Sequence, residues 1–381
     1  MNAVLGGLLL LLTVLDTGAA EVVPELKTRS VILITVDGMR PEDVFNGPDR
    51  AILDNPAYSG IEYPEYADAA KKHYLRADAA ESRAALMPFF WKTLAPRGIV
   101  LGNRERGSTA KVLNDQWFSA PGYIEILTGE PHAEVTSNDP IRYPHLTFME
   151  YAQQALGLGF TDVATIGSWD GFATLSSSRE GAFFTNAGYE RPAEQYATEK
   201  MKWLGEMQFD VMTLWPEGRS DAVTIGMATE YIARHQPRVV YIALGESDDW
   251  AHERRYDRYL DYMHKFDQYL ERLWTQLQAM DAYRDRTSLI ITTDHGRGAL
   301  KDWHEHDRQI EGSQYIWIAV IGPDTPDRGE VAPYPPVTQS DVAATALKLL
   351  GLDFMKFNPD AGSPIGIAAD CACGQQPRRS E

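Results

Sequence analysis

The sequence predicts an α/β fold in which a doubly wound, mainly parallel sheet is flanked by helices. The first observation is a set of continuous apolar runs, which suit strands buried on both faces. These runs are Val31–Val36, Val239–Leu244, Ser288–Thr292 and Tyr315–Ile321, with a weaker one at Val163–Ile166. The second observation is that segments with helical patterns lie between the runs, which is typical of βαβ units.

The segments with helical patterns account for most of the remaining chain. They are Glu81–Leu94, Pro121–Leu127, Thr147–Ala155, Ala222–His235, Arg255–Met280 and Gln339–Leu350. Residues 130–219 are less regular, with Pro, Gly and Trp scattered through short elements. We therefore expect this stretch to form an insertion or cap beside a functional site. Its aromatic residues are candidates either for a pocket wall or for the core: Trp169, Phe172, Trp203 and Trp215.

Length and hydropathy predict one catalytic domain over residues 21–370 of the 381-residue chain. Val4–Leu15 is an apolar run followed by small residues, which predicts a signal peptide over residues 1–20 and a periplasmic or secreted protein. An uncleaved N-terminal anchor is the alternative. A membrane span needs about 20 apolar residues, and no second run of that length follows, so we expect no span in the mature chain. Residues 371–381 read as a flexible tail.

Charge and cysteine content narrow the possible partners. The formal net charge is −18, which disfavours nucleic-acid polymers and anionic membranes as partners. An anionic small-molecule substrate would then require bound metal ions to supply positive charge. Only two cysteines are present, Cys371 and Cys373, so a disulfide framework is excluded. Nothing in the sequence indicates an oligomeric state.

Carboxylates and histidines follow three of the predicted strands at the points where the strands end. Asp37 follows the first strand, Asp248 and His252 follow the second, and Asp294 with His295 follows the third. Because ligands bind at the carboxyl ends of parallel strands, these side chains are expected to converge. Asp and His are common ligands of catalytic divalent ions, and zinc is the first choice.

Each of these residues also has a simpler interpretation. An aspartate after a strand is often only a turn residue or helix cap. The spacing from Asp248 to His252, however, lets one face of a helical turn present both side chains. Three unrelated caps at three strand ends are a weaker explanation than one metal site.

A candidate nucleophile comes from another segment. Ser119 precedes Pro121 and an apolar run that ends near Gly129, a pattern that predicts a serine at the start of a helix. The simpler interpretation is an N-cap serine. A helix N-terminus also attracts phosphate, and a metal ion in contact with the serine oxygen would promote its ionisation.

The order of these residues resembles that of the alkaline phosphatase superfamily, and the Asp37-Gly38-Met39-Arg40 element resembles its nucleotide pyrophosphatase/phosphodiesterase branch. The C-terminal segment from Gln339 to Gly351 is also typical of the superfamily. The resemblance implies two divalent ions, zinc or alternatively manganese. It implies that one ion is bound by Asp248, His252 and a late histidine, and the other by Asp37, Asp294, His295 and the Ser119 oxygen. For the late histidine we prefer His306 over His304, because Trp303 stands three residues before it as in similar bacterial sequences.

The chain departs from related families at two positions after the nucleophile. The diesterase branch has an Asn three residues after its nucleophile, where this chain has Gly122, so oxyanion binding is expected from backbone N–H groups near Ser119, from Arg40 or from Arg297. Sulfatases have an Arg in the place of Tyr123, which argues against a sulfatase. A third, magnesium, site has no clear ligands, although Glu246 is a candidate.

These observations predict a metal-dependent hydrolase of small phosphoric esters, a phosphatase or phosphodiesterase, that forms a phosphoserine on Ser119. A phosphoryl transferase or mutase with the same site is one alternative. A sulfatase-like hydrolase is another. The third is a catalytically degenerate, exported metal-binding protein.

Overall fold

The computed structural model describes residues 25–366. The signal peptide predicted over residues 1–20 and the cysteines at 371 and 373 lie outside the described residues, as does the predicted tail. Across the described chain, every helix falls short of the length or apolarity needed to span a bilayer. Export and the division into one catalytic domain stay predictions.

A central sheet of eight strands organises the chain, in the order β10-β2-β9-β7-β1-β6-β4-β5. Strands β5, β4, β6, β1 and β7 run parallel, whereas β9 is antiparallel to both of its neighbours. The strands of this sheet are β1 Ser30–Val36, β2 Gly98–Leu101, β4 Val163–Gly167, β5 Phe184–Ala187, β6 Val239–Leu244, β7 Thr287–Thr292, β9 Ile318–Ile321 and β10 Gly329–Glu330. A small second sheet consists of β3 Ser108–Lys111, β8 Tyr315–Ile316 and β11 Tyr334–Thr338.

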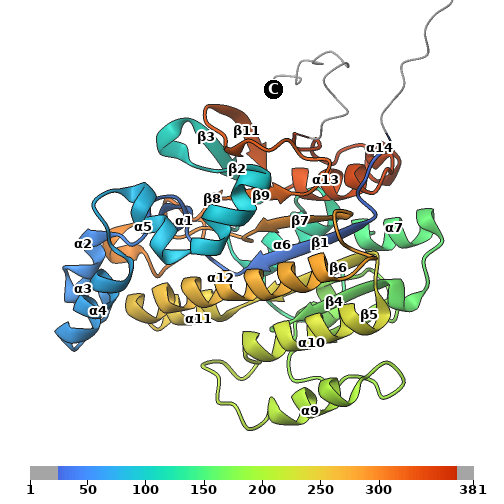
Figure 1. Ribbon diagram of the computed structural model, residues 1–381, viewed down its shortest axis with the longest axis horizontal. Helices are drawn as coiled ribbons and strands as arrows, with labels where there is room; N and C mark the ends of the chain where they lie inside the picture. The colour runs from blue at the N-terminus through green and yellow to red at the C-terminus, as the bar shows by residue number, and fades with distance from the viewer. Residues whose placement is uncertain (1–24, 367–381) are drawn as a thin grey trace, which may run out of the picture.

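Helices cover both faces of the central sheet, as Figure 1 shows. The α-helices are α1 Pro41–Asn46, α2 Arg50–Leu53, α3 Pro56–Ser59, α4 Pro64–Tyr74, α5 Ala79–Leu86, α6 Ser119–Thr128, α7 Phe148–Leu156, α8 Phe172–Leu175, α9 Glu199–Met207, α10 Asp221–His235, α11 Glu246–His252, α12 Tyr256–Ala279, α13 Asp341–Leu349 and α14 Phe354–Phe357. The short 3-10 and π-helical turns are η1 Phe90–Leu94, η2 Ala95–Arg97, η3 Arg104–Arg106, η4 Phe160–Asp162 and η5 Leu300–Asp302.

The two faces of the sheet each have their own hydrophobic core. In β1, Ile32 and Ile34 pack with residues of α10 and α12, whereas Val31 and Leu33 pack with residues of α6, α7 and α13. Successive side chains of a strand point to opposite faces, so a strand that is buried throughout must be apolar at every position. The prediction of a helix-flanked, mainly parallel α/β sheet is confirmed.

Two predicted elements are divided in the structure. The apolar run Tyr315–Ile321 forms β8 in the small sheet and β9 in the central sheet, with Trp317 between them. The predicted helix Glu81–Leu94 ends as α5 at Leu86, because Pro88 follows and cannot donate a backbone hydrogen bond. The carboxylate of Asp267 accepts hydrogen bonds from the N–H groups of Phe89 and Phe90 and so supports the new turn.

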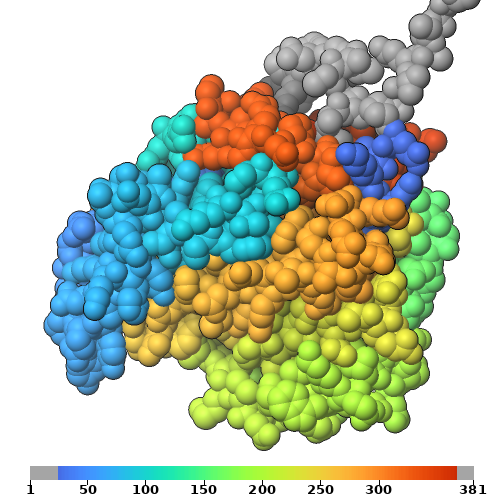
Figure 2. All heavy atoms as spheres, in the orientation of Figure 1, coloured from blue at the N-terminus to red at the C-terminus, as the bar shows by residue number. Residues whose placement is uncertain are grey.

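Residues 130–219, predicted as an insertion, contribute to the central sheet as well as to its surroundings. They contain β4 and β5, the two strands at one edge of the sheet. The segment around α9 lies at the bottom of the view in Figures 1 and 2, and Met201 and Leu204 of α9 belong to the same core cluster as residues of α10. Within residues 130–219, β4 and β5 therefore belong to the sheet, and the remaining residues lie around it.

Candidate active site

The ends of β1 and β7 bring three ionisable side chains into contact. His295 Nε2 lies 3.2 Å from Asp37 Oδ1 and 3.4 Å from Asp294 Oδ2. Adjacent strands are in register, with Thr35 beside Thr292, so the residues that follow them must meet at one edge of the sheet. The convergence expected from the sequence is present here.

Three buried atoms of this group lack a hydrogen-bond partner among the described residues: Asp37 Oδ1, Asp294 Oδ2 and His295 Nε2. Buried polar atoms without partners are rare, because each costs its desolvation free energy. The opposite nitrogen of the imidazole, Nδ1, lies 2.9 Å from the Gly296 carbonyl oxygen and must therefore carry a hydrogen. Nε2 is thus the nitrogen that can act as a metal ligand. These atoms fit a divalent cation bound between them.

The electrostatics of this group also favour a bound positive charge. Burial, with the neighbouring Asp37 carboxylate, raises the pKa of Asp294 to about 8. Burial alone would lower the pKa of His295, but the Asp294 and Asp37 carboxylates outweigh it and raise that pKa to about 9. A divalent cation would stabilise both carboxylates in their charged forms and His295 in its neutral form.

A second group forms around Asp248. His252 Nε2 lies 3.2 Å from Asp248 Oδ2, and both residues belong to α11, one turn apart. His306 Nε2 lies 3.0 Å from His252 Nε2 and 3.7 Å from Asp248 Oδ1. The two groups are continuous, because Asp248 Oδ1 is 3.9 Å from His295 Nε2. The structure therefore brings all six predicted Asp and His ligands together.

The two histidines of the second group are suited to ligation in their neutral form. Burial lowers the pKa of His306 well below its usual value, and it also lowers the pKa of His252. In contrast to His306, His304 contacts Glu305 at 3.1 Å. The geometry thus favours His306 over His304, and its role as a ligand stays a prediction.

Arg297, predicted as a possible substrate contact, is fully buried and bonded to the protein. Its guanidinium donates to the carbonyl oxygens of Gly38 and His304 and to the Asp248 carboxylate. Arg40 is also buried and forms an ion pair with Asp43 at 2.9 Å. Arg297 therefore links the residues that follow β1 to Asp248 of α11, whereas Arg40 is bound to Asp43 of α1.

Ser119 is the first residue of α6, and Phe118 is the N-cap residue. Because the N-cap position belongs to Phe118, the interpretation of Ser119 as a simple N-cap is wrong. Ser119 and Asp37 line the same pocket, which holds about 370 Å³. The predicted nucleophile thus faces the first group of acidic residues.

Gly122 allows α6 to approach the edge of the sheet that carries Asp294 closely. A Cβ atom at this position would lie 2.3 Å from the carbonyl oxygen of Asp294. No larger residue fits this backbone spacing, which gives a physical reason for glycine where the diesterase branch has Asn. Gly122 acts here through packing, because it has no side chain that could contact a substrate.

Tyr123 is a site residue whose contact the sequence did not reveal. Its buried hydroxyl donates a hydrogen bond of 2.8 Å to Asp37 Oδ2. The bond leaves Asp37 Oδ1 facing His295 and orients the carboxylate. The sequence marks Tyr123 only as the position at which sulfatases have an arginine, and it gives no sign of the contact with Asp37.

The remaining pocket wall is partly aromatic and partly polar. Trp169 and Trp215 line the pocket, whereas Phe172 is buried in the core and Trp203 is exposed on α9. Asn138 also lines it, and its Oδ1 accepts a 2.9 Å hydrogen bond from Ala120 N at the start of α6. No sequence signal marked Asn138, because it lies in an irregular loop.

Glu246, the candidate for a third metal site, is bonded within the protein. Its Oε1 accepts hydrogen bonds from Ser220 Oγ at 2.8 Å and Asp221 N at 2.9 Å. Asp221 in turn accepts bonds from the N–H groups of Gly245 and Glu246. These carboxylates fix the start of α11.

Fold and site together define a class of protein, the alkaline phosphatase superfamily, which contains sulfatases and phosphoester hydrolases that use divalent metals. Within it, the model of the sulfatase family matches residues 116–352, more than half of the chain. The chain belongs to the sulfatase family. No curated protein matches the sequence significantly.

Several solved structures share the fold at low sequence identity. A phosphonate monoester hydrolase from Silicibacter pomeroyi is 13% identical with a TM-score of 0.56, over 89% of this chain and 76% of the other. A phosphonate monoester hydrolase from Agrobacterium radiobacter is 13% identical with a TM-score of 0.51, over 89% and 78%. The lipoteichoic acid synthase from Listeria monocytogenes is 13% identical with a TM-score of 0.52, over 85% and 72%. These similarities concern the fold alone.

Proposed function

We propose that this protein is a metal-dependent hydrolase of phosphoric esters in which Ser119 is the nucleophile. One observation carries the proposal: Asp37 Oδ1, Asp294 Oδ2 and His295 Nε2 are buried without hydrogen-bond partners beside the pocket that Ser119 lines. Buried ligand atoms without partners beside a pocket are typical of a functional site that binds a charged group.

Two ions are proposed, with zinc as the first choice and manganese as the alternative. Asp37, Asp294, His295 and the Ser119 oxygen would hold one ion. Asp248, His252 and His306 would hold the other. When bound, such ions neutralise the phosphoryl oxygens and favour the alkoxide form of a serine.

Ser119 would perform the first of two displacements. Its oxygen forms a bond to phosphorus while the bond from phosphorus to the ester oxygen breaks, and the departing alcohol takes up a proton. A phosphoserine results. In the second displacement, a water oxygen attacks the phosphorus, the bond to Ser119 breaks, and the serine recovers its hydroxyl hydrogen from the water. A monoester then releases phosphate, and a diester releases a phosphate monoester.

The protein itself orients the reacting groups. Phe118 occupies the N-cap position of α6 without a side-chain capping bond, and Ser119 is the first residue of the helix. Tyr123 fixes the Asp37 carboxylate, and Arg297 fixes Asp248. Trp169 and Trp215 provide aromatic walls against which the organic part of an ester can pack.

Tyr123 also bears on the choice between phosphate and sulfate. The sulfatases that this sequence resembles have an arginine at the position of Tyr123. Here, the Tyr123 hydroxyl donates a hydrogen bond of 2.8 Å to Asp37. The arginine that lines the pocket, Arg219, donates to Asn186 and Thr224 rather than into free space. A phosphoric ester is therefore the preferred substrate.

Sulfate-ester hydrolysis is the second candidate, and the sulfatase family match is the observation that favours it. A panel of nitrophenyl phosphate, bis-nitrophenyl phosphate, nitrophenyl phenylphosphonate and nitrophenyl sulfate separates the two. Each ester is assayed with zinc, with manganese and after chelation. Chelator-sensitive hydrolysis of a phosphorus ester supports the proposal, whereas turnover of the sulfate alone would replace it with the second candidate.

The chemistry at Ser119 needs its own control. Ser119→Ala is compared with Ser59→Ala, a buried serine in α3 that lies outside the pocket. We expect the first variant to lose turnover and to keep its bound metal, and the second to retain both. Full activity of Ser119→Ala with metal bound would rule out the covalent route.

A further inference from the structure

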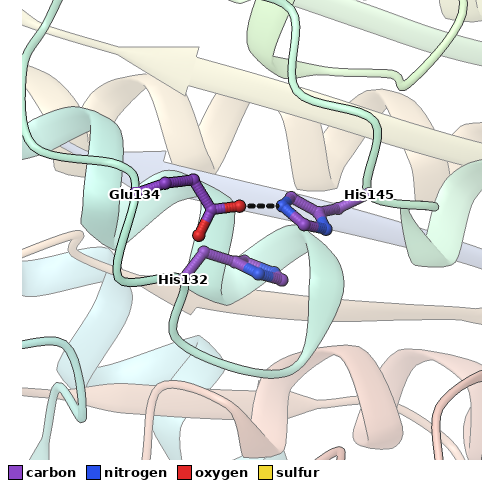
Figure 3. Close-up of side chains that lie close together, drawn as sticks. All are labelled: His132, Glu134 and His145. Atoms are coloured by element: carbon purple, nitrogen blue, oxygen red, sulfur yellow. Dashed lines mark hydrogen bonds and ion pairs between the residues drawn. The ribbon is translucent and has the colours of Figure 1, made fainter.

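A separate cluster of metal-ligating side chains lies on the loop that follows α6. His132, Glu134 and His145 offer three ligand atoms that all lie within 4.8 Å of one another. Figure 3 shows the Glu134 carboxylate pointing toward the His145 ring, with the His132 ring beside them. None of the three lines the pocket that contains Ser119. The cluster joins the beginning and the end of one loop.

The hydrogen bonds around His132 determine which of its nitrogens is free to bind an ion. Thr128 Oγ1 lies 2.9 Å from His132 Nε2 and donates its own hydrogen to the carbonyl oxygen of Ile124 at 2.7 Å. The hydroxyl therefore accepts from His132, so Nε2 carries the hydrogen and Nδ1 has a free lone pair. A hydrogen-bonded second nitrogen is what orients a histidine ligand in metal sites.

The contact between His145 and Glu134 places a nitrogen and an oxygen ligand together. His145 Nε2 lies 2.5 Å from Glu134 Oε1, and the His145 ring stacks on the His132 ring with centroids 3.6 Å apart. Ligands of a tetrahedral zinc ion with bonds of about 2.0–2.1 Å lie about 3.3–3.4 Å apart, so coordination requires this pair to open. The Glu134 side chain is 54% exposed and has room to do so. The two stacked rings must also turn out of their nearly parallel arrangement, because an imidazole nitrogen binds an ion in the plane of its ring.

We propose that His132, Glu134 and His145 form a third metal site, which binds a zinc ion through two imidazole nitrogens and one carboxylate oxygen. This ligand set matches the preference of zinc for nitrogen with a single carboxylate, and water completes the coordination. The site is distinct from the six Asp and His residues at the strand ends. It does not depend on the proposed function.

The position of the site indicates what the ion would do. Val135 and Tyr143 of the same loop pack against Ala120 and Ile124 of α6 in a small hydrophobic cluster. Between them, Asn138 accepts the hydrogen bond from Ala120 N next to the nucleophile. An ion that joins His132 to His145 closes this loop at both ends. The third ion is thus a clamp that holds the loop against the helix of Ser119.

The test measures zinc per chain and affinity in the full-length protein. Wild type, His132→Gln, Glu134→Gln and His145→Gln are stripped with chelator, and zinc binding is followed by titration calorimetry and by metal analysis after dialysis. His73→Gln, a histidine on the exposed side of α4, is the matched control. We expect each histidine variant to bind one zinc ion fewer than wild type and the control to match wild type. Glu134→Gln is expected to bind the third ion at least about tenfold more weakly.

A second measurement separates the proposed site from a general loss of structure. Zinc is expected to raise the Tm of wild type by more than it raises the Tm of His145→Gln, because only the former gains the third ion. If His132→Gln fails to fold, the variants at the exposed Glu134 and the partly exposed His145 still decide the question. Equal zinc content and equal affinity in wild type, His145→Gln and Glu134→Gln would overturn the proposal.

Discussion

The strand-end site and the loop cluster contain the same kinds of side chain, but the fold holds them differently. Asp37, Asp294 and His295 follow central strands and are at most 8% exposed. In the loop cluster, the side chains of His145 and Glu134 are 27% and 54% exposed. The strand-end group has unpartnered buried atoms, whereas the loop residues hydrogen-bond to one another and to Thr128.

This difference shows how a fold can keep ligand atoms unpaired. Unpartnered polar atoms cost free energy, so the surrounding structure must prevent their side chains from turning to other partners. At the strand ends, the sheet register and the bonds from Gly38 and Tyr123 impose that constraint. A surface loop imposes no such constraint, and its residues satisfy one another. The contrast predicts effects of different size for substitutions at the two sites.

The largest effect is expected from Ser119→Ala. Loss of the nucleophile is expected to lower kcat by on the order of a thousandfold or more, because removal of a covalent nucleophile leaves only binding and electrostatic effects. The decrease in kcat is measured by steady-state hydrolysis of the preferred nitrophenyl ester. A decrease of less than about tenfold, with metal content unchanged, would contradict the assignment of Ser119.

Asp294→Asn is expected to have the next largest effect. The buried carboxylate contributes both charge and an unpartnered ligand atom, so its loss is expected to reduce activity by more than about a hundredfold and to release one ion. Glu134→Gln in the loop is the matched comparison, since it also replaces a carboxylate with an amide. It should weaken binding of a different ion with a much smaller effect on kcat. Similar activity losses in the two variants would remove the contrast between the sites.

Gly122→Ala tests the close approach of α6 to the strand end. The added methyl group would meet the Asp294 carbonyl oxygen at 2.3 Å, so we expect a loss of about 1–3 kcal/mol in the free energy of unfolding. Denaturant unfolding measures this loss. Gly226→Ala in α10 is the control, because its nearest neighbour is the flexible end of Leu204 at 3.1 Å. An unchanged stability of Gly122→Ala would show that the backbone spacing is not tight.

Tyr123→Phe is expected to have the smallest effect. It removes one hydrogen bond to the Asp37 carboxylate, and hydrogen bonds of this kind orient metal ligands. Zinc affinity at the strand-end site is expected to decrease by about tenfold, with zinc binding by the loop cluster unchanged. Competition with a chelating dye measures the zinc affinity of the strand-end site and that of the loop cluster. An equal decrease at both sites would indicate a general structural change instead.

The sequence predicted the sheet and the convergence of Asp and His residues at the strand ends, because both depend on local patterns. Apolar runs identify buried strands, and the residues that follow parallel strands must share one edge. Tyr123 and Asn138 could not be found in this way, because their contacts with Asp37 and Ala120 depend on how α6 and a loop pack. For a related reason, charge in the sequence does not reveal that Arg40 is paired with Asp43.

The most direct test of the central claim is the chemical state of Ser119 during turnover. The metal-loaded wild type is mixed with its preferred phosphorus ester and quenched in acid, and the peptide that contains Ser119 is analysed by mass spectrometry. The two-displacement mechanism predicts a phosphoryl group on Ser119, and none on that peptide in Ser119→Ala. Turnover of the ester with an unmodified Ser119 at every time point would contradict the mechanism.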